Sequence, residues 1–216
     1  MQYKVLAAVA STLLFAGTAR AQVAVSIWTN QSTAAGNATL AQATTLNAGV
    51  PNATTTVSAI NFDSGNTNGY TIGGFLNNPA GLSSSIATAS LDNTYMLLTG
   101  QIFLNAGINS FVVSHDDGLQ LNVDGIGMVV NQPGPTSPVD TPFNVNNPGS
   151  AGLFNFELSY GECCGPPARL VFAINGSPVG SVPEPATWAM MLLGFGGIGF
   201  AMRHRRRTQE VLPQIA

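Results

Sequence analysis

Two adjacent carboxylates, Asp116 and Asp117, are the residues of this 216-residue sequence best suited to binding chemistry. Two negative charges so close repel each other unless a cation lies between them. Calcium takes several oxygen ligands and accepts carboxylates, amides and backbone carbonyls. The pair therefore predicts a calcium site. The alternative is structural, because Asp side chains also stabilise tight turns such as the one that Gly118 indicates, and such a turn needs no metal.

The only two cysteines, Cys163 and Cys164, are neighbours in the sequence. This spacing excludes a C-x-x-C metal site. An exported protein meets an oxidising compartment, where disulfides form and persist. A disulfide between neighbours closes a tight ring, with the two Cα atoms closer together than in ordinary bridges. We favour this vicinal disulfide, and two free thiols or an intermolecular bond are the alternatives.

The sequence offers little for catalysis. It contains no G-x-S-x-G, H-E-x-x-H or phosphate-loop motif, which would mark common nucleophile, zinc and phosphate sites. We expect His115, beside Asp116, to lie exposed in a turn. Glu157 and Glu162 could pair as in a glycosidase, but Glu157 occupies a polar position of an alternating strand, where a solvated side chain is expected. We predict that the protein is not an enzyme, with a glycoside hydrolase as a remote alternative.

Charged residues make up only 8% of the sequence, against roughly 25% in an average globular protein. The basic residues gather at the two ends of the chain. Residues 22–182 hold eight acidic residues and one basic residue, Arg169, which gives this segment a net charge of −7. A nucleic-acid-binding protein needs a basic surface that neutralises phosphates. We therefore predict no nucleic-acid partner.

The N-terminus has the three parts of a secretory signal peptide in the expected order. Lys4 supplies the positive charge, residues 5–16 form a short apolar run, and Ala19 and Ala21 supply the small residues of an A-x-A cleavage site. We predict that the signal peptide spans residues 1–21 and that the mature chain begins at Gln22.

The C-terminus contains a second apolar run, at 186–202. Its 17 residues carry no charge, and as a helix they would span roughly 26 Å, near the lower limit for crossing a membrane. The basic cluster at 203–207 would remain in the cytoplasm by the positive-inside rule, together with the tail at 208–216. The pattern predicts one transmembrane helix with the preceding chain outside the inner membrane.

The residues ahead of this run resemble a known sorting signal. Pro183, Glu184 and Pro185, followed by the Gly-rich apolar run and the basic cluster, are similar to the PEP-CTERM sorting signal. The resemblance covers 182–207. It implies a Gram-negative bacterium that makes extracellular polysaccharide, recognition and removal of the tail by an exosortase, and delivery to the cell surface or extracellular matrix. The alternative is an ordinary single-pass membrane anchor.

Between the two ends, the pattern is typical of strands. Apolar and polar residues alternate in short runs separated by Gly, Asn and Pro, and no convincing helical period occurs. Alternation of period two buries one face of each strand, and many such strands favour two packed sheets. We therefore predict an all-β, antiparallel, jelly-roll-like β-sandwich over 22–181, with long polar loops at 31–56 and 132–150. The expected strands are 23–28, 57–62, 95–104 (broken at Gly100), 108–114, 119–124, 126–130, 154–160 and 170–174.

The segment 111–125 resembles the core hairpin of the protective-antigen-type β-sandwich domain, which occurs in bacterial toxins, in glycosidases and as the lectin head of yeast flocculins. An apolar strand, an Asp-Asp-Gly turn and an alternating strand carry this likeness. The segments 152–160 and 168–172 are similar to later strands of the domain. The resemblance extends over 94–176 and implies a β-sandwich fold, which hosts several functions.

In flocculin-type members the paired Asp residues coordinate calcium, and the calcium holds sugar hydroxyls. The resemblance therefore implies a calcium-assisted sugar site at Asp116 and Asp117. Its further ligands would come from loops, with Asn144, Asn146 and Asn147 as candidates. Flocculin-type members pair a comparable Cys-Cys with distant cysteines, and this sequence departs from them because it has no other cysteine.

These observations lead to one leading hypothesis and two alternatives. The first is an exported, exosortase-sorted surface or matrix protein that binds carbohydrate with the help of calcium, with extracellular polysaccharide as its partner. The second is a structural protein of the biofilm matrix without a discrete ligand site. The third is the hydrolase.

Overall fold

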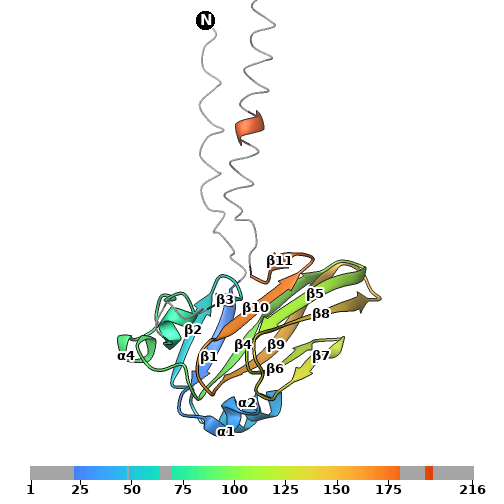
Figure 1. Ribbon diagram of the computed structural model, residues 1–216. Coiled ribbons are helices and arrows are strands. Elements are labelled where there is room, and N and C mark those ends of the chain that lie inside the picture. Colours follow the sequence, from blue (N-terminus) through green and yellow to red (C-terminus); the bar gives the residue numbers. More distant parts are fainter. Residues whose placement is uncertain (1–21, 48, 64–69, 181–192, 197–216) are drawn as a thin grey trace, which may run out of the picture. The chain divides into compact units, whose positions relative to one another are not determined.

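The computed structural model describes residues 22–47, 49–63, 70–180 and 193–196. The chain divides into two compact units. One is Ala21–Ser181, called the body below, and the other combines Met1–Arg20 with Val182–Ala216. Figure 1 shows the body as strands with a few short helices.

The described part of the body is built from strands joined by short helices. The strands are β1 (Val23–Trp28), β2 (Ala53–Val57), β3 (Asn61–Asp63), β4 (Thr94–Leu104), β5 (Gly107–His115), β6 (Gly118–Val123), β7 (Gly127–Gln132), β8 (Val139–Asn147), β9 (Gly152–Glu162), β10 (Arg169–Ile174) and β11 (Ser177–Pro178). The helices are α1 (Ser32–Ala35), α2 (Leu40–Asn47), α3 (Ile72–Phe75) and α4 (Ser84–Ala87).

The strands form two antiparallel sheets that pack as a sandwich. The first has the order β2-β1-β4-β9-β6-β7, and the second has the order β11-β10-β5-β8, with β3 also pairing with β10. In Figure 1, β10, β5 and β8 lie in front of β4, β9 and β6. Each sheet combines strands that are distant in sequence, because β4 pairs with β9 and β5 pairs with β10. The predicted all-β body with antiparallel sheets is confirmed.

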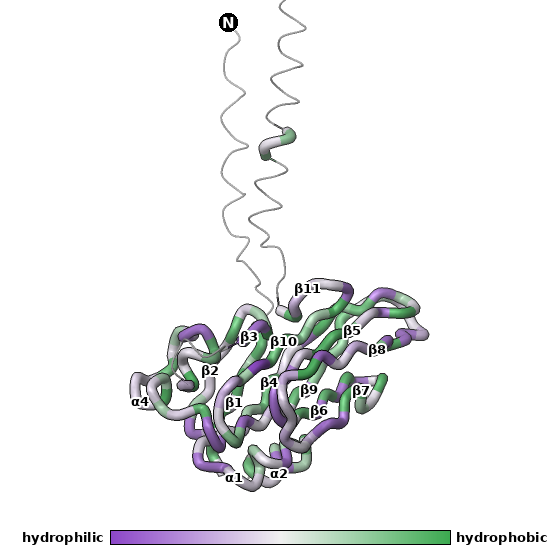
Figure 2. Tube along the Cα trace, viewed as in Figure 1, coloured by the Kyte–Doolittle hydropathy of each residue, from purple (hydrophilic) through white to green (hydrophobic). Residues whose placement is uncertain are grey.

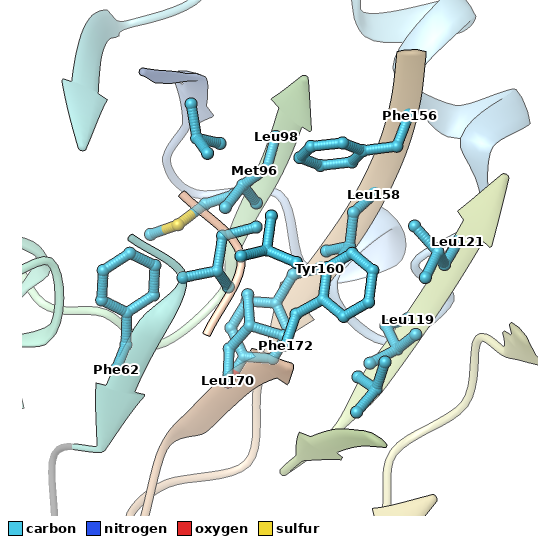
Figure 3. Close-up of a cluster of buried hydrophobic side chains, with 14 of the residues drawn as sticks. Phe62, Met96, Leu98, Leu119, Leu121, Phe156, Leu158, Tyr160, Leu170 and Phe172 are labelled. Carbon is cyan, nitrogen blue, oxygen red and sulfur yellow. The ribbon is translucent and has the colours of Figure 1, made fainter. Parts of the chain in front are cut away.

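The core lies between the two sheets and contains the inward residues of the alternating strands. Figure 2 shows hydrophobic and hydrophilic residues alternating along the chain, and Figure 3 shows the buried cluster. Phe156 of β9 and Phe172 of β10 meet across the sandwich with their ring centroids 5.9 Å apart. Phe75 of α3 stacks on Tyr160 of β9 at 5.6 Å. The core thus joins both sheets and the connection that carries α3.

The structure corrects several details of the predicted strands. β4 continues through Gly100, where a Cβ atom would lie 3.1 Å from the ring of Phe156. The glycine therefore makes room for a core ring and does not break the strand. The run at 57–62 divides between β2 and β3, and the expected loop at 31–56 holds α1, α2 and most of β2. Within the expected loop at 132–150, residues 139–147 form β8.

α1 and α2 cover part of the outer face of the six-stranded sheet. Trp28 and Tyr95 pack there with their ring centroids 5.9 Å apart, together with small residues of the α1–α2 segment. Ser159 of β9 also faces this way, yet it is buried, and its hydroxyl donates to the carbonyl of Ala38 at 2.6 Å. Its position opposite to the core residues predicts solvent exposure, and this prediction is wrong because the helices shield that face.

The predicted terminal signals fall mostly outside the described residues. These include the signal peptide at 1–21 with Ala19 and Ala21, the motif Pro183, Glu184 and Pro185, and the basic cluster at 203–207. Of the apolar run at 186–202, only 193–196 are described, and they are helical. Within the described ranges, no helix is long and apolar enough to cross a membrane.

Candidate ligand site at the Asp-Asp turn

Asp116 and Asp117 form the turn that leads from β5 in one sheet to β6 in the other. The backbone N–H of Asp116 donates to the carbonyl of Arg169 at 2.9 Å, and that of Asp117 donates to the carbonyl of Thr136 at 3.0 Å. β10 and the loop before β8 therefore hold the turn in place. Asp117 has a φ of +59°, a left-handed conformation that is uncommon for a residue with a side chain.

Gly118, the third residue of the motif, is required by close packing. A Cβ atom there would overlap the backbone carbonyl of Pro133. Gly118 lies opposite Gly161 in the β6–β9 ladder, and a Cβ atom at Gly161 would overlap the backbone of Ala35 in α1. The two glycines thus allow the loop at 133–138 and α1 to lie directly against the strands that carry the turn.

Both carboxylates of the turn are buried, with exposed fractions of 5% for Asp116 and 4% for Asp117. Asp117 Oδ2 accepts the backbone N–H of Cys163 at 2.7 Å. Asp116 Oδ1 accepts the backbone N–H of Asp117 at 3.1 Å. These two hydrogen bonds fix the direction of each carboxylate and bring the end of β9 against the turn.

A third carboxylate, Glu162, lies behind the turn. It is the last residue of β9, is fully buried, and accepts hydrogen bonds from the hydroxyls of Tyr70 and Tyr160. In the β4–β9 ladder it lies opposite Thr94, whose buried hydroxyl has no hydrogen-bond partner in the described part of the chain. The interior of the sandwich is therefore polar at this end, in contrast to the apolar core beyond it.

Burial raises the pKa of all three carboxyl groups. The pKa of Asp116 rises from 3.8 to about 6, and that of Glu162 rises from 4.5 to about 8. The pKa of Asp117 also lies above 3.8, although the N–H of Cys163 opposes the rise by stabilising the charged form. The negative charges of the neighbouring carboxylates add to the effect on Asp116 and Glu162. Ionising the whole cluster is therefore costly unless positive charge is brought to it.

The basic residue of the body does not supply that charge. The guanidinium of Arg169 lies 3.7 Å from Asp63 and 3.6 Å from Asp140. Both partners are solvent-exposed, and Asp140 lies opposite Ser114 on the outer side of β8. Only the backbone carbonyl of Arg169 reaches the turn.

His115 is buried, which corrects the prediction of an exposed turn histidine. It is the next inward residue of β5 after Phe111 and Val113, so its ring points into the sandwich. Nδ1 lies 2.8 Å from the carbonyl oxygen of Asp117, and Nε2 lies 2.8 Å from Oε1 of Gln132. The ring therefore holds the turn through Nδ1 and connects it to the end of β7 through Nε2.

Cys163 and Cys164 lie immediately after Glu162 and form a disulfide with each other. Cys163 is buried, whereas Cys164 is exposed. Cys164 and Gly165 have φ values of +71° and +95°. This segment therefore makes a tight left-handed bend beside the turn.

The suggested additional ligands do not come near the Asp pair. Asn144, Asn146 and Asn147 lie toward the end of β8 that pairs with the start of β5, whereas the turn follows the other end of β5. Asn147 is opposite Gly107, eight residues before His115, or about 27 Å along an extended strand. The side chain of Asn147 instead bonds to its own loop, including the carbonyl of Ser150 at 3.0 Å.

Glu162 belongs to this site, whereas the sequence suggested it only as a glycosidase partner of Glu157. Its position was visible in the pattern, because Phe156, Leu158, Tyr160 and Glu162 follow one another at a spacing of two and share the inward face. The same rule places Glu157 on the outer face, where it is exposed as predicted. The two glutamates therefore lie on opposite faces of β9 and cannot flank one glycosidic bond. No comparable signal pointed to Tyr70, which precedes α3 in a distant connection.

The arrangement offers oxygen atoms as ligands. Within the described ranges, no group of three or more His, Cys, Asp or Glu side chains is arranged to hold a metal ion. A cation at Asp116 and Asp117 would therefore need backbone carbonyls, hydroxyls or ligand oxygens in addition to the two carboxylates. Calcium commonly accepts such mixed oxygen ligands.

Two solved domains have a fold similar to that of the body. The "PA14 sugar-binding domain from RTX adhesin" aligns with 77% of this chain and 95% of its own, at 22% identity and a TM-score of 0.52. The PA14 domain of the antifreeze protein MpAFP aligns with 75% of this chain and 84% of its own, at 18% identity and a TM-score of 0.52. Identity at this level shows the fold alone, and it confirms the resemblance to the protective-antigen-type β-sandwich.

The C-terminal segment matches the PEP-CTERM protein-sorting motif over residues 181–207. This match confirms the sorting signal predicted from Pro183, Glu184 and Pro185, and it indicates an exported protein that is sorted to the surface. No curated protein matches the chain.

Proposed function

We propose that the protein is a calcium-assisted carbohydrate-binding module that an exosortase releases at the cell surface or into the extracellular matrix of a Gram-negative bacterium. The observation that carries the proposal is the turn of Asp116 and Asp117. Two adjacent carboxylates are buried there, and the basic residue of the body points elsewhere. A divalent cation would supply the missing positive charge.

The residues present fit calcium by their chemistry. Asp116 and Asp117 would hold the ion, and the adjoining loop at 133–138 offers backbone carbonyls and is largely exposed. When bound, calcium supplies coordination positions that sugar hydroxyls can occupy. The protein's own part is to fix the direction of the Asp117 carboxylate through the amide of Cys163, and to hold the backbone of the turn through the ring of His115.

The backbone of Asp117 supports a binding function for the turn. A residue with a side chain at positive φ costs free energy, and such conformations persist mostly where a site requires them. A carboxylate at this position also bears the cost of burial. A turn that served only the fold would be more stable with Asn here, because Asn adopts the same backbone conformation and brings no buried charge.

The likeness of the fold to a domain described as sugar-binding supports carbohydrate as the ligand. The polysaccharide that the sorting signal implies would be a ligand available at the surface. The body carries few charges, so its contacts with a ligand would be made by hydroxyl, amide and backbone groups, which also bond to neutral sugars.

A second function, a structural protein of the matrix, is favoured by one observation. Both Asp side chains already accept backbone hydrogen bonds, from Asp117 and from Cys163. Side chains engaged in this way can stabilise a turn without a metal ion. The structural reading needs no ligand at all.

Calcium titration decides between the two functions. We expect isothermal titration of calcium into the purified protein to show saturable heat, and a glycan array to give signals that a chelator abolishes. Asp117→Asn should remove both, whereas Asp124→Asn, the same change in the exposed β6–β7 turn, should preserve both. Absence of heat and of any thermal shift at millimolar calcium would replace the binding function by the structural one.

A further inference from the structure

The end of β9 joins the Asp-Asp turn through a single backbone donor. The N–H of Cys163 donates to Asp117 Oδ2 at 2.7 Å, across 46 residues of sequence, and both groups are buried. This hydrogen bond fixes the direction of the Asp117 carboxylate from the side of β9. The direction of the Cys163 N–H therefore matters to any ligand that needs the Asp117 carboxylate in a fixed orientation.

The backbone on the C-terminal side of that donor has an uncommon conformation. Cys164 has a φ of +71° and is followed by Gly165 at +95°. Glycine adopts such angles freely, but a residue with a side chain avoids them. The disulfide between Cys163 and Cys164 removes the freedom of the intervening peptide to rotate away. Once the ring is open, Cys164 can return to an ordinary negative φ, which would turn the neighbouring peptide units.

We propose that the Cys163–Cys164 disulfide is a positioning device for the ligand site, which keeps the Cys163 N–H on Asp117 and makes ligand affinity depend on redox state. The inference rests on the proposed function in one respect, namely that Asp117 is a ligand residue. The positioning itself is a property of the bend and can be measured without any ligand.

The chemistry of opening the ring is ordinary thiol–disulfide exchange. A thiolate of a dithiol reductant attacks Sγ of Cys164, which is on an exposed residue, breaks the S–S bond and releases the thiolate of Cys163. The second thiol of the reductant then closes its own disulfide and releases Cys164. In total, two electrons and two protons pass to the protein disulfide, and the reductant becomes a cyclic disulfide.

The disulfide would make the ligand site differ between the two compartments that the protein meets. In the reducing cytoplasm the ring would be open, and in the oxidising compartments beyond the inner membrane it would be closed. The ligand site would therefore reach full affinity only after export, when the bend has formed its disulfide.

Hydrogen exchange at one amide tests the positioning directly. The processed protein is compared with and without an excess of dithiol reductant, and exchange at the Cys163 amide is followed by NMR. We expect reduction to speed exchange at this amide at least tenfold, while amides in the centre of β5, such as that of Val113, keep their protection. Unchanged protection at Cys163, or equal loss of protection throughout the body, would overturn the proposal.

Calcium affinity, measured by isothermal titration in the same two states, separates this inference from the proposed function. We expect reduction to weaken calcium binding at least fivefold, and the double variant Cys163→Ser/Cys164→Ser to bind as weakly with or without reductant. If reduction leaves the calcium affinity unchanged, the proposed redox control is wrong and the calcium site stands. If the oxidised protein binds no calcium but its Cys163 amide responds, the positioning stands and the proposed function fails. Should the double variant not fold, the wild-type comparison still decides.

Discussion

Gly118 and Gly161 lie directly opposite each other across the β6–β9 ladder, and the backbone of another segment packs closely against each of them. Pro133 covers one and Ala35 covers the other. This pair of glycines is the point at which the loop at 133–138 and α1 reach the strands that carry the Asp-Asp turn. The motif therefore depends on its glycine as much as on its two acids.

Adding a methyl group at this point should be costly. We expect Gly118→Ala to reduce the free energy of unfolding by about 1–3 kcal/mol, because the Pro133 carbonyl must move away. The same displacement should weaken calcium binding, since the loop bonds to Asp117 through Thr136. Urea unfolding and calcium titration measure the two effects. Gly134→Ala is the control: this glycine lies in the same loop with open space around its Cβ position, so a comparable loss there would contradict the explanation.

The core of β9 provides a test of the sandwich. Phe156 is 1% exposed and packs against Phe172, so Phe156→Ala should cost about 3–5 kcal/mol. Glu157→Gln, on the exposed face of the same strand, should change stability by less than about 0.5 kcal/mol. Equal effects in chemical unfolding would show that the strand does not separate an inner from an outer face.

Ser159→Ala tests the cover that α1 and α2 provide. The hydroxyl of Ser159 donates to the Ala38 carbonyl at 2.6 Å and accepts the backbone N–H of Gln120 at 3.1 Å. Removing a buried partner of this kind should cost about 1–3 kcal/mol. A neutral effect on the unfolding midpoint would mean that the helices leave this face open to water.

The carboxylate cluster predicts how stability depends on pH. Because the folded-state pKa of Glu162 is about 8 and its ordinary value is 4.5, the folded protein binds more protons than the unfolded chain between these values. Stability contributed by this group is therefore greatest at low pH and is lost as the pH rises through 8. Each pKa unit corresponds to at most about 1.4 kcal/mol, so we expect a loss of a few kcal/mol between pH 5 and pH 8.5 without calcium. Asp116, with a pKa of about 6, shifts stability in the same direction.

Glu162→Gln identifies the group responsible. The amide keeps the size of the side chain and stays neutral, so thermal melts of this variant should depend much less on pH across the same interval. The tyrosines that bond to Glu162, Tyr70 and Tyr160, have raised pKa values because they are buried beside it, and they stay protonated throughout. An undiminished pH dependence in the variant would assign the effect to Asp116 and Asp117.

Asp117→Asn should separate stability from binding. Without calcium the variant should be more stable than the wild type by about 1 kcal/mol, because Asn keeps the positive φ and removes a buried charge. With calcium the order should reverse, since binding to the folded state contributes about 2.7 kcal/mol at a hundredfold excess over Kd. Melting curves with and without calcium make this comparison. A variant that is less stable in both conditions would indicate that the carboxylate serves the turn alone.

The sequence was informative wherever alternation was strict. The inward faces of β5, β6, β9 and β10 follow from the spacing of their apolar residues, and the Asp-Asp-Gly motif marks the turn between the sheets. The same alternation, continued to the next inward position of β5 and of β9, places His115 and Glu162 inside the sandwich. The polar character of His115 suggested exposure, and it misled because hydrogen-bond partners compensate for the burial of its ring.

Other contacts of the site and of the outer face of β9 could not be inferred locally. Tyr70, Thr136 and Ser159 owe their roles to segments that approach from far along the chain, and nothing in their immediate sequence records the approach. Alternation places Ser159 correctly on the outer face of β9 but does not reveal that α1 and α2 cover that face. The suggested ligands Asn144, Asn146 and Asn147 are wrong because β8 places them far from the turn. Their amide side chains suit calcium, but residue type alone does not show where a strand places them.

The pairing of β4 with β9 and of β5 with β10 also bears on how the chain folds. β9 lies between β4 and β6 in one sheet, and β10 lies beside β3 and β5 in the other, so neither sheet is complete until strands near the end of the body have been made. Chains dominated by such distant contacts fold slowly. The two sheets are therefore expected to be completed late in synthesis, after β9 and β10 have been made. The ligand site, which draws on β4, the Asp-Asp turn and the end of β9, would then appear all at once.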